Sequence, residues 1–63
     1  MEKFTKFEGK TIIAALNNAM SNDLNGILAA EKAGKTPLFT ADFIQQAYVD
    51  LIERVEKMTR KNN

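Results

Sequence analysis

A short break between two stretches of helical hydrophobic spacing constrains this chain more than any other feature. The six residues 34–39, Gly-Lys-Thr-Pro-Leu-Phe, combine a glycine suited to end a helix with a proline that cannot continue one. In a chain of 63 residues this break leaves room for one helical hairpin. We therefore predict an all-α fold, a single antiparallel helical hairpin domain spanning residues 1–63 with its turn at 34–39.

The first helix is predicted over residues 11–33, after an N-terminal arm at 1–9 that Gly9 ends. Its apolar residues recur mostly at steps of three and four, which places them on one side of a helix. They are Ile12, Ile13, Leu16, Met20, Leu24, Ile27 and Leu28. Turn-forming residues at 21–26, including Gly26, leave a three-helix alternative open. We favour the continuous helix because the apolar spacing keeps its phase across this segment.

The second helix is predicted over residues 41–60. Thr40 suits the N-cap, Asp42 suits the first turn, and Phe39 and Ile44 occupy the positions of a hydrophobic staple. A heptad-like seam follows at Ala41, Ile44, Tyr48, Leu51, Val55 and Met58, and Phe43, Ala47 and Ile52 widen it. An apolar stripe this wide faces more than one neighbouring helix.

Two helices alone cannot cover such faces, and a domain this small barely offsets its chain entropy. With neither cysteine nor histidine, neither a disulfide nor a common zinc site is available. We therefore predict a homodimer of hairpins forming a four-helix bundle. Its core and dimer interface are predicted at Ile13, Leu16, Met20, Leu24, Ile27, Leu28, Phe43, Ile44, Tyr48, Leu51, Ile52, Val55 and Met58. Tyr48 is interpreted as a core residue whose hydroxyl reaches an edge, and less readily as a catalytic acid.

The N-terminal arm carries two aromatic residues between lysines. Phe4 and Phe7 alternate with Lys3, Lys6 and Lys10. The favoured interpretation is that both rings pack on the hairpin as core while the lysines face solvent. A partner-binding surface is the first alternative, and a small nucleic-acid surface, with rings stacking on bases, is the second.

The composition offers little for chemistry. Gly9-Lys10-Thr11 and Gly34-Lys35-Thr36 end like a phosphate-binding loop, but the earlier glycine and the strand that the full motif needs are missing. We expect no enzyme activity, no cofactor and no bound metal ion. Nine basic and eight acidic residues give a net charge of +1, so nucleic acid is an improbable partner. No apolar run suits a membrane span, and absence of cysteine fits a cytoplasmic protein.

Two resemblances suggest a role. The hairpin plan resembles the Rop-like dimeric helical hairpins, which bind paired RNA hairpins. In its overall sequence character, the whole chain also resembles the short early proteins encoded in the exo–xis region of lambdoid bacteriophages. It extends from Met1-Glu2-Lys3-Phe4 through Thr40-Ala41-Asp42-Phe43 to Arg60-Lys61-Asn62-Asn63.

The phage resemblance implies a non-enzymatic accessory protein in the cytoplasm of the bacterial host. It would act through an unknown host or phage protein, on host physiology or on the choice between lysis and lysogeny. A nucleic-acid-binding regulator of the dimeric hairpin type is the alternative function.

Overall fold

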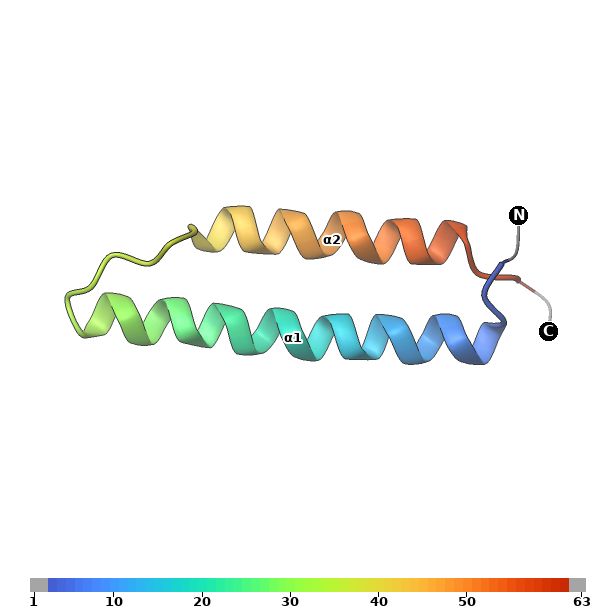
Figure 1. Ribbon diagram of the computed structural model, residues 1–63, viewed down its shortest axis with the longest axis horizontal. Helices are drawn as coiled ribbons and strands as arrows, with labels where there is room; N and C mark the ends of the chain where they lie inside the picture. Colours follow the sequence, from blue (N-terminus) through green and yellow to red (C-terminus); the bar gives the residue numbers. More distant parts are fainter. Residues whose placement is uncertain (1–2, 62–63) are drawn as a thin grey trace.

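The computed structural model describes residues 3–61, and these form one antiparallel helical hairpin (Figure 1). Helix α1 spans Lys6–Lys32 and helix α2 spans Ala41–Lys57. The two helices lie side by side, joined at one end of the molecule by the connection that contains the predicted turn. The hairpin is long and thin, 48 × 15 × 13 Å. The predicted all-α hairpin is confirmed.

Helix α1 begins five residues earlier than the sequence pattern suggested. Thr5 is its N-cap: the backbone N–H of Glu8 donates to Thr5 Oγ1 at 3.1 Å, and the backbone N–H of Thr5 donates to Glu8 Oε1 at 2.9 Å. This reciprocal capping box satisfies two amide groups that a helix N-terminus otherwise leaves without partners. The predicted arm over residues 1–9 and the helix start at residue 11 were therefore wrong, and Gly9 lies inside the helix.

Helix α1 then continues unbroken through residues 21–26, as favoured over the three-helix alternative. It ends in the predicted way. Gly34 has φ +75°, and its amide donates to the carbonyl of Glu31 while the amide of Lys35 donates to that of Ala30. These two bonds form a Schellman motif, in which a glycine adopts the left-handed conformation without steric cost.

Helix α2 begins as predicted at Thr40, whose Oγ1 accepts from the backbone N–H of Phe43 at 3.1 Å. The ring of Phe39 stacks on that of Phe43, with centroids 5.1 Å apart. The helix ends at Lys57 instead of the predicted residue 60. The residues after Lys57 leave the helix because they pair with the start of the chain.

That pairing closes the hairpin at the end opposite the turn. The amide of Phe4 donates to the carbonyl of Met58 at 2.7 Å, and the amide of Arg60 donates to the carbonyl of Phe4 at 2.8 Å. Phe4 and Thr59 thus form a parallel bridge. We call this arrangement, together with Gly9 of α1 packed against Thr59, the terminal clasp. A Cβ on Gly9 would lie 2.9 Å from Thr59 Cβ, closer than real side chains approach.

The apolar core of the hairpin is very small. Among residues 3–61, Ile27 is the only apolar side chain classed as buried, with 8% of its surface exposed. The side chains between the helices are half-buried: Ile12, Ile13, Leu16, Ala19, Met20, Leu24 and Ala30 in α1, and Ile44, Ala47, Tyr48, Ile52 and Val55 in α2. One hairpin therefore does not enclose its own apolar side chains.

Candidate interaction surface

A side-chain hydrogen bond joins the two helices near the middle of α2. The Tyr48 hydroxyl donates to a carboxylate oxygen of Asp23 at 2.6 Å. This hydrogen bond, together with partial desolvation, raises the pKa of Tyr48 above its ordinary value. The predicted position of Tyr48, in the seam with its hydroxyl at an edge, agrees with this geometry.

Asp23 was not among the predicted site residues, although a signal for it exists in the sequence. Leu16, Met20, Asp23 and Ile27 follow steps of four, three and four, so Asp23 shares the phase of the inward apolar residues. A carboxylate at such a position needs a partner, and the only tyrosine of the chain lies in the facing seam. The turn-forming residues at 21–26 indicated a possible break in the helix, and no role was predicted for Asp23.

Three exposed residues of the predicted interface lie along one flank of α2. Phe43, Leu51 and Met58 are 55%, 42% and 38% exposed. Each stands one position before a half-buried residue; these half-buried residues are Ile44, Ile52 and Thr59. Because all three ridge residues share this position relative to an inward-facing one, they lie on the same flank. We call these three residues the α2 ridge. They were predicted to belong to the core and dimer interface, and a single hairpin leaves them exposed.

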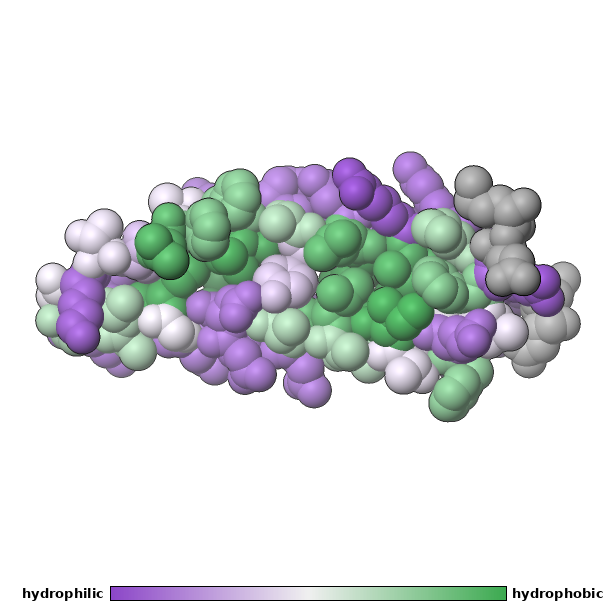
Figure 2. All heavy atoms as spheres, viewed as in Figure 1, coloured by the Kyte–Doolittle hydropathy of each residue, from purple (hydrophilic) through white to green (hydrophobic). Residues whose placement is uncertain are grey.

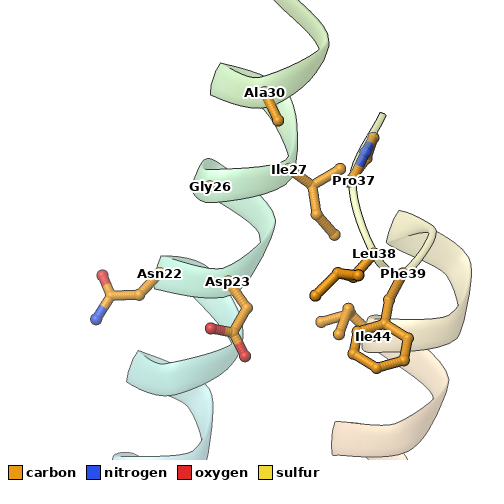
Figure 3. Close-up of a pocket in the computed structure, with 9 residues that line it drawn as sticks. All are labelled: Asn22, Asp23, Gly26, Ile27, Ala30, Pro37, Leu38, Phe39 and Ile44. Carbon is orange, nitrogen blue, oxygen red and sulfur yellow. The ribbon is translucent and has the colours of Figure 1, made fainter. Parts of the chain in front are cut away.

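Beside the ridge, at the turn end of the molecule, the surface is hollowed (Figure 3). The hollow has a volume of about 440 Å³. Its walls come from α1, from the connection and from the first turns of α2. They are Asn22, Asp23, Gly26, Ile27, Ala30, Pro37, Leu38, Phe39 and Ile44. Ile27, Leu38 and Ile44 point toward one another across it.

The α1 side of the hollow is low at Gly26 and Ala30. A Cβ added to Gly26 would meet nothing within 4 Å, so open space lies above this glycine. The other side is high and apolar, since Leu38 is 95% exposed and Phe39 is 53% exposed. Figure 2 shows apolar surface along this face over both helices, with polar surface near its middle. The face is therefore a groove flanked by large apolar side chains.

The opposite flank carries fewer exposed apolar residues. Leu28 of α1 is 54% exposed and Val49 of α2 is 38% exposed. Leu28 follows the inward-facing Ile27, and Val49 follows the inward-facing Tyr48, whereas the ridge residues precede inward-facing ones. Leu28 and Val49 therefore lie on the other side of the helix–helix contact. Neither residue belongs to the walls of the hollow beside the ridge.

The predicted arm residues are placed differently from one another. Phe4 is half-buried in the terminal clasp, whereas Phe7 is 77% exposed. The favoured prediction that both rings pack as core was wrong for Phe7, because the early start of α1 places that residue on an outward side of the first turn. Lys3, Lys6 and Lys10 are exposed.

The described residues bring together few groups of other kinds. Within residues 3–61 there is no cluster of three or more acidic side chains that could hold a metal ion. Neither described helix is both long enough and apolar enough to cross a membrane. The apolar face is thus the main feature of this surface.

Comparison with models of known protein families, with curated proteins and with solved structures finds no significant match to this chain. The fold and surface define a two-helix hairpin with an uncovered apolar face.

Proposed function

We propose that this protein is a small non-enzymatic regulatory protein that acts through protein–protein interaction, beginning with its own assembly into a four-helix bundle. One observation carries the proposal. Among the described residues eight large apolar side chains are exposed, while a single apolar side chain is buried. Contiguous exposed apolar surface on a small protein marks an interaction site.

The surface area agrees with a dimer. The chain exposes 5195 Å², whereas a compact monomer of 7.1 kDa exposes about 4,100 Å². The excess of about 1,100 Å² per chain exceeds the roughly 800 Å² that each partner buries in a standard stable interface. A dimer that buries this excess has the area of an obligate homodimer.

The biological setting of the proposal comes from sequence character. The resemblance to the early proteins of the lambdoid exo–xis region supports an accessory role in the cytoplasm of a bacterial host. There the dimer would bind a host or phage protein and influence host physiology or the choice between lysis and lysogeny. No residue carries this part of the proposal by itself.

A nucleic-acid-binding regulator is the second candidate because the terminal clasp gathers basic residues from both ends of the chain. Lys6 and Lys10 of α1 lie at the same end of the hairpin as Lys57 and Arg60. Phosphate contacts made by such residues release counterions, so affinity for RNA or DNA would fall steeply as salt rises. Absence of binding to short RNA and DNA duplexes in low salt would remove this candidate.

Sedimentation equilibrium of the full chain tests the assembly. We expect a mass of two chains at micromolar concentration, together with a cooperative, concentration-dependent loss of helical circular dichroism on heating. A stable, folded monomer of 7.1 kDa under the same conditions would contradict the proposal. Affinity capture of the native dimer from bacterial lysate, followed by mass spectrometry, would then identify the further partner.

A further inference from the structure

We infer that a second copy of this chain seats its α2 ridge in the groove over α1, and that the two-fold axis of the dimer runs parallel to the helices. The inference rests on the homodimer proposed above and specifies its face and its orientation. Both turns would then lie at the same end of the four-helix bundle.

The first argument is the difference in relief between the two helices on this flank. The α2 ridge presents Phe43 and Leu51, more than 40% exposed, whereas α1 presents Ala19 and Gly26 on its corresponding side. Ala19 and Gly26 each precede an inward-facing residue, Met20 and Ile27 in turn, so they share one flank. A large side chain from outside therefore finds room over α1 but not over α2.

The second argument is the level of these residues along the hairpin. The Tyr48–Asp23 hydrogen bond sets two residues at the same level, and Ile44 lies beside Ile27 across the hollow. Counting from these pairs, Phe43 lies near the level of Gly26, and Leu51 near that of Ala19. Along each hairpin a large ridge residue thus has a small residue of α1 at nearly the same height.

These levels select the symmetry axis. An axis parallel to the helices keeps every residue at its own height and places α2 of one copy over α1 of its partner. Phe43 of one copy then fills the space above Gly26 of the other, and Leu51 of one copy contacts Ala19 of the other. The two-fold symmetry makes each of these contacts occur twice. An axis perpendicular to the helices within the interface would set α2 against α2, ridge on ridge, and α1 against α1, with empty space between the small residues. Close packing favours the parallel axis.

A second copy suits this face in length and charge. The apolar surface runs along both helices of a 48 Å molecule, and the chain itself supplies a helical partner of that length. The net charge of +1 gives two copies little repulsion. On the α1 side of the groove Asp23 is the one charged residue of its described lining, and its carboxylate accepts the Tyr48 hydroxyl. The excess area of about 1,100 Å² per chain is enough for a stable dimer.

The face is tested by a matched pair of substitutions on one helix. Leu51→Glu places a carboxylate on the ridge, and Val49→Glu places it at a similarly exposed position on the other flank. In sedimentation equilibrium we expect Leu51→Glu to raise the dimer dissociation constant at least 100-fold and Val49→Glu to change it less than fivefold. A dimer unaffected by Leu51→Glu, or equally weakened by both, would overturn the inference while leaving a homodimer intact.

A second pair avoids any effect of Leu51→Glu on folding. Gly26→Gln fills the groove with a good helix former where the hairpin itself has open space, and Asn25→Gln adds to the exposed neighbouring position. Only Gly26→Gln should weaken the dimer, with helical circular dichroism kept at high concentration. Equal dimer affinity of the two variants would contradict occupancy of the groove.

The orientation is tested with a spin label on Lys35→Cys, since the chain has no other cysteine. With the axis parallel to the helices, the distance between the two labels in the dimer should be shorter than half the 48 Å length of the hairpin. A distance near that full length would place the turns at opposite ends and overturn the inferred axis. A wild-type chain that stays monomeric throughout would instead contradict the proposed function itself.

Discussion

The two ends of this hairpin are finished in opposite ways. At the terminal clasp, Phe4 and Thr59 pair through their backbones, and Gly9 lets Thr59 approach α1 more closely than any side chain would permit. At the turn end, Leu38 is almost fully exposed beside an unfilled hollow. The same pair of helices is thus closed by close contact at one end and open at the other.

The difference shows which groups of the described hairpin are satisfied within it and which apolar side chains it leaves exposed. Backbone hydrogen bonds at the clasp satisfy groups of the chain itself, so they require nothing from outside. Exposed apolar side chains at the turn end gain free energy only when something covers them. Two glycines of α1 mark the contrast, since Gly9 faces an occupied space and Gly26 faces an open one.

The substitution Gly9→Ala should have the largest effect. Its methyl group would overlap Thr59, and such overpacking costs about 1–3 kcal/mol, more than the gain in helix propensity returns. We expect a lower free energy of unfolding in urea at a fixed chain concentration. Thr59→Gly in the same chain should recover most of the loss. A Gly9→Ala chain as stable as wild type would mean that the clasp is loosely packed.

The substitution Gly26→Ala in the same helix should act in the opposite direction on a single hairpin, so its effect is measured at a chain concentration below the dimer dissociation constant. No atom lies within 4 Å of the added methyl group, and alanine favours a helix interior over glycine by up to about 1 kcal/mol. Urea unfolding beside Gly9→Ala, at the same chain concentration, gives the comparison. If both substitutions destabilise the protein equally, the two ends do not differ in the way described.

Tyr48→Phe, between the two ends, should have the smallest effect, because Asp23 is exposed and water competes for its carboxylate. The hydrogen bond to Asp23 raises the pKa of Tyr48, so above pH of about 10 the unfolded chain loses the phenol proton before the folded one. The stability from this bond is therefore present at neutral pH and lost as pH rises through the raised pKa.

Tyrosinate absorbance follows this titration directly, because Tyr48 is the only tyrosine. Urea unfolding across the alkaline range should show a steeper loss of stability in wild type than in Tyr48→Phe. The comparison with Tyr48→Phe separates the contribution of Tyr48 from every other effect of alkaline pH. Parallel alkaline losses in the two proteins would show that the bond does not stabilise the hairpin.

Much of the fold was predictable because its signals are local. Thr40 caps α2 through a residue three positions on, and Gly34 ends α1 through its own backbone angle. The capping box of Thr5 and Glu8 is equally local, but Gly9 directed the interpretation toward an arm. The true reason for that glycine is Thr59, fifty positions later, and no local pattern reveals so distant a contact.

The sequence indicated which residues of the candidate surface share a side of their helix, but not how exposed those residues are. Heptad spacing predicted that Leu51 and Met58 belong to an apolar seam. Spacing could not show that one hairpin leaves them exposed, nor that the small residues Ala19 and Gly26 form a low wall beside them. Those properties depend on how the two helices are rotated against each other, which a spacing pattern within one helix does not contain.

The terminal clasp also joins the two segments of the described chain that are furthest apart in sequence. Bringing such distant residues together costs more loop-closure entropy than any other contact of the hairpin. The turn at Gly34 needs only neighbouring residues, so contacts can grow outward from it as the helices align. The two backbone hydrogen bonds of Phe4 and the contact between Gly9 and Thr59 offset that entropic cost at the end of the hairpin where it is largest.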